Sequence, residues 1–135
     1  MESIRNKIIK KIKSNKGFIT LDNFIKISMY DSKNGYYIKE NPIGKSADFI
    51  TAPEISQLFG ELIGLYIYDH WRNYINKKFT LIELGPGKGT LISDLINISS
   101  NFQNYLSKIN LILLEKNLKL IEYQKNILKI KNNKL

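Results

Sequence analysis

Residues 81–90 read Leu-Ile-Glu-Leu-Gly-Pro-Gly-Lys-Gly-Thr, an apolar run that ends in an acid and three alternate glycines. The apolar residues 79–84 predict a short buried strand, and Leu91, Leu95 and Ile98 recur at helical spacing in a helix over 90–98. The glycines therefore fall on a strand-to-helix turn, where missing side chains allow a ligand to lie against the backbone. This context is typical of a loop that holds a nucleotide cofactor.

The spacing of the glycines separates two kinds of cofactor loop. The dinucleotide pattern G-x-G-x-x-G would need a glycine at position 90, where the sequence has Thr90. The pattern present is Glu83-x-Gly85-x-Gly87-x-Gly89. It resembles motif I of class I S-adenosylmethionine (SAM) methyltransferases.

A second acid follows about one β-α-β unit later. Residues 109–114, Ile-Asn-Leu-Ile-Leu-Leu, predict a buried strand that ends at Glu115. A carboxylate at this point can accept hydrogen bonds from both hydroxyls of an adenosine ribose, whichever cofactor carries it. A plain turn at Gly85 and a solvated Glu115 are the structural alternatives, but the ordered set favours cofactor binding. We expect Lys88 to be a solvated loop side chain without a role.

Composition narrows the classes of function. The 135-residue chain has no cysteine and one histidine, His70, which excludes disulfides, thiolate metal sites and histidine-rich metal sites. Its formal charge of +9 comes almost entirely from lysines spread along the chain, which favours a solvated surface over nucleic-acid binding. No apolar run is long enough for a membrane span. We expect a cytoplasmic protein, or a mitochondrial matrix protein if the host is eukaryotic.

The amino-terminal half predicts helices around a hairpin-like segment. Apolar residues at helical spacing indicate a helix from residue 4 and a second one capped by Thr20, each with a core-facing apolar side. Asn34-Gly35 then predicts a tight turn before Tyr36-Tyr37. We expect residues 1–76 to form a helical amino-terminal region and residues 77–135 to begin a Rossmann-like domain.

The segment before that domain has the pattern of a helix start. Thr51 and Glu54 have the spacing of a capping box, and Pro53 suits the first turn. They predict one long helix whose apolar face is formed by Ile55, Leu58, Phe59, Leu62, Ile63 and Tyr66.

Three blocks, in order, carry a more specific resemblance. Residues 34–37, 47–61 and 83–90 together resemble the MidA family, and they span most of the chain. The resemblance implies a SAM-dependent methyltransferase that methylates protein arginine and is linked to respiratory complex I assembly. Its implied substrate is an arginine of the 49-kDa subunit of complex I.

The resemblance also implies roles for individual residues. Gly85, Gly87 and Gly89 would lie against SAM, while Glu83 would hold its methionine end and Glu115 its ribose. The side of the pocket near the methionine would be formed by Thr51, Pro53 and Glu54. The resemblance assigns no catalytic residue.

The resemblance implies an α/β class I methyltransferase fold, and the length of 135 residues makes it a partial one, in which a helical amino-terminal region precedes the first β-α-β unit. Because the first strand of that sheet is central, it would have an unpaired apolar edge without the strands that follow. We therefore expect a fragment, truncated or completed by a second chain. The alternatives are a non-catalytic remnant or assembly module and an NAD-type Rossmann oxidoreductase, which Thr90 disfavours.

Overall fold

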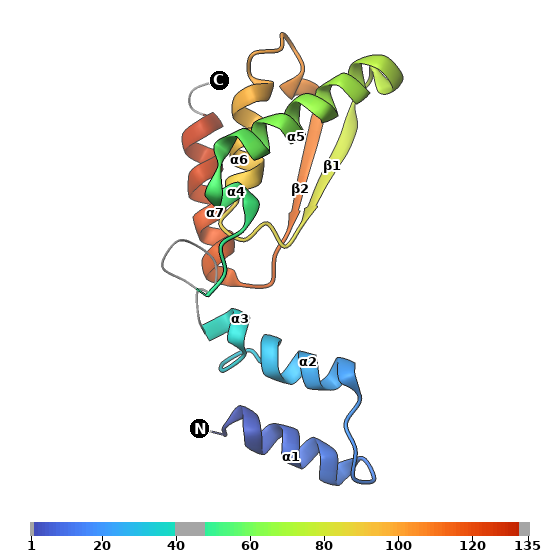
Figure 1. The fold of residues 1–135 in the computed structure, drawn as a ribbon, viewed down its shortest axis with the longest axis vertical. Helices are drawn as coiled ribbons and strands as arrows, with labels where there is room; N and C mark the ends of the chain where they lie inside the picture. The colour runs from blue at the N-terminus through green and yellow to red at the C-terminus, as the bar shows by residue number, and fades with distance from the viewer. Residues whose placement is uncertain (1, 40–47, 133–135) are drawn as a thin grey trace. The chain divides into compact units, whose positions relative to one another are not determined.

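The computed structural model describes residues 2–39 and 48–132, which belong to two compact units, Met1–Pro42 and Ile43–Leu135 (Figure 1). The smaller unit contains the helices α1 (Ile4–Ser14), α2 (Leu21–Tyr30) and α3 (Tyr36–Lys39). The larger unit contains, in chain order, α4 (Ala52–Ile55), α5 (Gln57–His70), a π-helical turn (Trp71–Ile75), β1 (Phe79–Leu84), α6 (Thr90–Ser99), a 3₁₀ turn (Leu106–Lys108), β2 (Ile109–Leu114) and α7 (Leu118–Asn132). The domain boundary expected after residue 76 stays a prediction.

Polar contacts stabilise the helices of the smaller unit. Ser3 caps α1 by accepting a hydrogen bond from the N–H of Asn6 at 3.2 Å. Lys7 of α1 forms an ion pair with Asp31 at the end of α2, and this hydrogen bond lowers the pKa of the Asp31 carboxyl. The expectation of a buried apolar side on both helices is wrong, because no described side chain of α1 or α2 is fully buried.

The hairpin-like turn predicted at Asn34-Gly35 is also corrected. A type I′ turn needs positive φ at both central residues, and neither of these residues has it. Instead, the Asp31 carboxylate accepts hydrogen bonds from the N–H groups of Lys33 and Asn34, at 3.2 and 3.0 Å. This turn leads into helix α3, which contains both tyrosines.

The predicted long helix is interrupted near its start. Ser56 has extended backbone angles, so the one-turn helix α4 ends at Ile55 and α5 begins at Gln57. Thr51 precedes α4 but its side chain makes no capping hydrogen bond, so the predicted capping box is absent.

Helix α5 packs through small residues instead of its expected apolar face. Gly60 and Gly64 are its buried residues, whereas Leu58, Leu62 and Tyr66 are more than half exposed. An added Cβ at Gly60 would lie 2.6 Å from Cβ of Asp94, and one at Gly64 would lie 2.5 Å from Cγ2 of Ile98. The two glycines, one turn apart, therefore let the backbone of α5 approach α6 closely.

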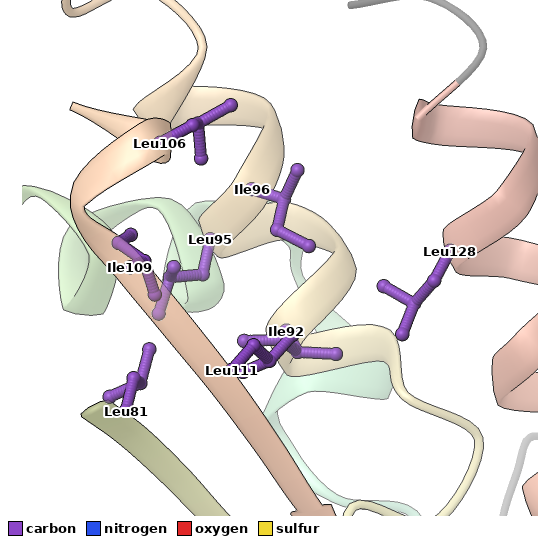
Figure 2. A pocket seen from close by; sticks show the side chains of 8 residues that line it. All are labelled: Leu81, Ile92, Leu95, Ile96, Leu106, Ile109, Leu111 and Leu128. Carbon is purple, nitrogen blue, oxygen red and sulfur yellow. The ribbon is translucent and has the colours of Figure 1, made fainter. Parts of the chain in front are cut away.

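Both strands are confirmed with their predicted bounds, and they pair in parallel from Phe79 opposite Ile109 to Leu84 opposite Leu114. The expectation that both strands are buried is wrong, because every second residue of each strand is exposed. Alternate side chains point to opposite faces. On one face, Leu81, Ile109 and Leu111 point toward α6. An apolar cavity of about 310 Å³ lies here, lined by these three residues, by Ile92, Leu95 and Ile96 of α6, and by Leu106 and Leu128 (Figure 2). The centre of this layer is α6, whose Ile92 and Leu95 are almost fully buried.

The opposite face of the sheet is open to solvent. It consists of the even-numbered strand residues, all exposed: Thr80, Ile82, Leu84, Asn110, Ile112 and Leu114. Leu84 is 74% exposed and Leu114 55%, so a continuous apolar strip faces water. We call these six residues the open face.

An aromatic cluster fills the end of the larger unit near the start of β1. Tyr105 is fully buried, Tyr68 stacks on Phe102 with ring centroids 3.7 Å apart, and Trp71 lies 4.8 Å from Tyr105. The indole N–H of Trp71 donates a hydrogen bond to the carbonyl oxygen of Lys77 at 2.8 Å, which fixes the turn before β1. Burial raises the pKa of the Tyr105 hydroxyl to about 12.

Within residues 2–39 and 48–132, no helix is long and apolar enough to cross a membrane.

Candidate functional site: a cleft at the glycine loop

The glycine loop connects the carboxyl end of β1 to the start of α6. Gly85, Gly87 and Gly89 all have positive φ, at +65°, +57° and +78°, a region that side-chain-bearing residues rarely adopt. The loop is tied back by two backbone hydrogen bonds of 2.8 Å, from Gly85 to the carbonyl of Leu114 and from Gly89 to that of Pro86. The alternate glycines are therefore required by the backbone itself.

Beside this loop lies a cleft of about 190 Å³. It is lined by Thr51, Pro53, Glu54, Glu83, Gly85, Pro86, Gly87, Lys88, Thr90 and Leu91. Six of the eight residues predicted for the site are among them, contributed by two segments about 30 residues apart in the sequence. The structure thus brings the Thr51–Glu54 segment against the glycine loop.

Glu83 lines the cleft from the carboxyl end of β1. Its Oε2 atom is buried and has no hydrogen-bond partner. Because burial disfavours the charged form, the pKa of Glu83 is raised above its ordinary value. A cationic or hydrogen-donating ligand group that reached this carboxyl from the cleft would supply the missing partner.

Glu54 connects the short helix α4 to the loop. Its Oε1 accepts a hydrogen bond from the hydroxyl of Thr90, and its Oε2 lies 3.8 Å from Nζ of Lys88. The Glu54 side chain is 14% exposed and that of Lys88 25%. The expectation that Lys88 is a solvated side chain is therefore wrong, since it lies against the cleft and pairs with an acid.

Glu115 and Gly89 are not among the residues that line the cleft. Gly89 caps the start of α6. Glu115 directly follows β2, and its Oε1 accepts hydrogen bonds from the N–H groups of Lys116 and Asn117, at 2.7 and 2.9 Å. These bonds hold the carboxylate at the carboxyl end of β2, next along the sheet from the glycine loop.

Sequence reasoning missed five contributors: four residues that line the cleft, Pro86, Lys88, Thr90 and Leu91, and one residue behind the loop, Gln124. The side-chain amide of Gln124, on α7, donates a hydrogen bond to the carbonyl oxygen of Gly87 at 2.6 Å. Nothing in the sequence near Gln124 indicates this contact. Lys88 and Thr90 flank Gly89, so their place in the motif was the available signal.

The described part of the chain contains no group of three or more His, Cys, Asp or Glu residues suited to a metal ion. The charged side chains among the described residues that line the cleft are those of Glu54, Glu83 and Lys88.

Known relatives match most of this chain. The mitochondrial protein arginine methyltransferase NDUFAF7 of Bos taurus is 42% identical over 120 residues, which are 87% of this chain and 27% of the relative. The Homo sapiens protein of the same name is 38% identical over the same shares. The Drosophila melanogaster homolog is 39% identical over 64% of this chain and 20% of its own length. The chain thus spans about a quarter of the curated relatives it matches.

A solved structure confirms the fold. A protein from Burkholderia thailandensis, solved with S-adenosyl-homocysteine bound, superposes with a TM-score of 0.75 at 20% identity. The superposition covers 94% of this chain and 33% of the other. The expected fold class, a partial Rossmann-like α/β fold, is therefore confirmed.

Residues 62–135 match the family described as "Putative S-adenosyl-L-methionine-dependent methyltransferase". Together with the relatives, this match confirms the resemblance drawn from the three sequence blocks. Because the matched region is more than half of the chain, the protein belongs to this S-adenosyl-L-methionine-dependent methyltransferase family.

Proposed function

We propose that the cleft beside the glycine loop binds SAM and that the chain is the cofactor-binding part of a protein-arginine methyltransferase. One observation carries this proposal. The loop, the unpartnered carboxylate of Glu83 and the Thr51–Glu54 segment line a single cleft. Membership of the family and the solved relative with S-adenosyl-homocysteine bound support the choice of cofactor.

Different residues of the site bind different parts of the cofactor. Gly85 and Gly87 leave room for the ligand to lie against the loop, and Gly89 lets the chain enter α6 at positive φ. Glu83 accepts a hydrogen bond from the ammonium group of the methionine end. Glu115 binds the ribose hydroxyls with the lone pairs that its two backbone N–H bonds leave free. Thr51, Pro53 and Glu54 form the wall near the methionine end.

When bound, SAM supplies a methyl group already activated by the sulfonium, so the protein needs little acid-base chemistry of its own. The residues of this chain hold the cofactor in one orientation, so that an acceptor nitrogen can approach in line with the methyl group. The glycines allow the loop its positive φ angles, and the two backbone hydrogen bonds hold it in this conformation.

The substrate follows from the relatives. Proteins named as arginine methyltransferases act on protein arginine, and we infer the same class of substrate here. An arginine of a complex I 49-kDa-type subunit is the specific acceptor that we propose. The relatives are also named as mitochondrial, which supports a matrix location in a eukaryotic host. For any other host we propose a cytoplasmic location.

The open face bears on how the enzyme is assembled. Exposed Ile82, Leu84, Ile112 and Leu114 form an apolar strip that a class I methyltransferase sheet would cover with helices. We infer that further polypeptide, within the same protein or in a second chain, covers this face and provides the acceptor site. A non-catalytic assembly module is the second candidate function, and the same uncovered face favours it.

Calorimetric titration with S-adenosyl-homocysteine tests cofactor binding. We expect saturable binding by the wild-type chain and its loss in Gly87→Val and Glu115→Ala. Gly17→Val is the matched control, because Gly17 also has positive φ but does not line the cleft. No binding by a folded wild-type chain would contradict the proposal, and binding of NADH in its place would favour the dinucleotide alternative.

An assay of methyl transfer to an arginine peptide then separates the enzyme from the assembly module. It is run with and without a polypeptide that matches the rest of the relatives. Transfer only in the mixture indicates an enzyme that needs completion. Binding without transfer in the mixture indicates the assembly module.

A further inference from the structure

Lys88 is the one basic residue among the described residues that line the cleft. Its neighbours there include two acids, Glu54 and Glu83. The Lys88 side chain is only 25% exposed, so it lies along the cleft instead of extending into water as a solvated lysine does.

The pairing with Glu54 does not account for Lys88 fully. The separation of 3.8 Å between Nζ of Lys88 and Oε2 of Glu54 exceeds a hydrogen-bond distance, while Oε1 of Glu54 is occupied by Thr90. Lys88 thus keeps ammonium hydrogens available to another acceptor. Glu54 holds the lysine at the cleft without saturating it.

Glu83 needs a hydrogen-bond donor, whereas Lys88 needs an acceptor. The buried Oε2 of Glu83 lacks a donor, as Lys88 lacks an acceptor at hydrogen-bond distance, and both side chains line the same cleft. A ligand that carries an ammonium and a carboxylate on neighbouring atoms would satisfy both. The free amino-acid group is such a zwitterion.

We propose that Lys88 binds the carboxylate of the cofactor's amino-acid end, while Glu83 takes its ammonium, and that Glu54 is the positioning residue for Lys88. This inference rests on the proposed function, because it concerns the methionine end of the same ligand. It makes Lys88 a specificity-determining residue, which selects cofactors that keep the amino-acid carboxylate.

The test compares two ligands that differ only in that carboxylate: S-adenosyl-homocysteine and its decarboxylated analogue. Affinities are measured by calorimetry for wild type, Lys88→Met and Lys88→Arg. We expect Lys88→Met to weaken S-adenosyl-homocysteine by about tenfold or more, as for the loss of a charge-assisted hydrogen bond. The affinity for the decarboxylated analogue should change by no more than about twofold. Lys88→Arg, which keeps the charge, should retain the preference for the carboxylate.

Two further variants serve as controls. Lys78→Met makes the same substitution at an exposed lysine before β1, at the strand end away from the glycine loop, and should change neither affinity. Glu83→Gln should weaken both ligands equally, since both keep the ammonium. The wild-type preference for the carboxylate is measured without any variant, so a Lys88 variant that fails to fold does not remove the test.

The outcomes distinguish a failure of the role of Lys88 from a failure of cofactor binding. If Lys88→Met weakens both ligands equally, or if wild type binds them equally well, the role of Lys88 is overturned while cofactor binding stands. If folded wild type binds neither ligand, the proposed function fails, and the inference about Lys88 fails with it.

Discussion

The Gln124 side-chain amide donates a hydrogen bond to the carbonyl oxygen of Gly87 at 2.6 Å, across 37 positions of sequence. Gln124 is 4% exposed, and its Cγ lies where an added Cβ at Gly89 would come within 3.3 Å. Helix α7 therefore holds the glycine loop from the side, through one amide and its stem. The conformation of the loop depends on a residue outside the motif.

Replacing Gln124 by Met should destabilise the protein. The substitution keeps the length of the side chain but leaves the buried carbonyl of Gly87 without its donor, a loss of about 1–3 kcal/mol. Chemical denaturation of both proteins measures the difference. Gln103→Met, at an exposed position, is the matched control, and an equal effect of the two variants would contradict the role of Gln124.

Gly64→Ala should be unfavourable even though alanine is the better helix former. The new Cβ would lie 2.5 Å from Cγ2 of Ile98 and 3.3 Å from Cα of Leu95, so α5 must move away from α6. Overpacking of this kind costs roughly 1–3 kcal/mol, more than the gain of about 1 kcal/mol in helix propensity.

The double variant Gly64→Ala/Ile98→Ala checks the cause. Removing Cγ2 of Ile98 relieves the closest contact, so the double variant should be less destabilised than the sum of the two single ones. Additive effects would show that α5 and α6 do not meet at this point.

Glu83 should make stability depend on pH. Burial raises its pKa in the folded state, so above the ordinary value of 4.5 the folded chain retains a proton that the unfolded chain has lost. The contribution of Glu83 is therefore present at low pH and is lost as pH rises through the raised pKa. The other charged groups at the cleft, Glu54 and Lys88, remain in both proteins compared below.

Urea unfolding of wild type and Glu83→Gln from pH 4 upward measures this dependence. The variant should gain stability relative to wild type as pH rises through that window, because its amide does not ionise. Parallel curves for the two proteins would show that Glu83 is not desolvated.

The open face should drive self-association. Substituting Leu84 and Leu114 by Thr replaces two exposed apolar side chains with β-branched polar ones that suit a strand. Sedimentation should show less association at equal concentration, with the melting temperature nearly unchanged. For comparison, Leu95→Ala in the buried layer should lower the free energy of unfolding by about 2–5 kcal/mol. Unchanged association in the Thr variant would mean that this face is not the adhesive surface.

The elements predicted correctly are those whose signal is local. Both strands appear with their predicted bounds, because a short and mainly apolar run of residues is a local signal for a strand. The glycine loop follows for the same reason, since its alternate glycines match three positive φ angles. Here the sequence pattern and the backbone requirement coincide.

The predictions that failed were overridden by contacts between residues far apart in the sequence or by a competing local hydrogen bond. Thr51 and Glu54 have capping-box spacing, but Glu54 is recruited by Thr90, 36 positions away, and the helix breaks at Ser56. Asn34-Gly35 forms no hairpin, since the Asp31 carboxylate accepts hydrogen bonds from the N–H groups of Lys33 and Asn34 and the chain continues into α3. The apolar residues of α5 have helical spacing, yet its glycines make the contact with α6. Contacts such as these cannot be read from spacing alone.

Trp71 is the only tryptophan of the chain and lies in the larger unit, with its ring among Tyr68 and Tyr105. Its fluorescence therefore reports on the unit that contains the cleft, whereas circular dichroism also follows the helices of Met1–Pro42. Coincident unfolding curves from the two signals would show one cooperative transition, and separate curves would resolve two. The natural sequence thus contains a built-in optical probe for one of its two units.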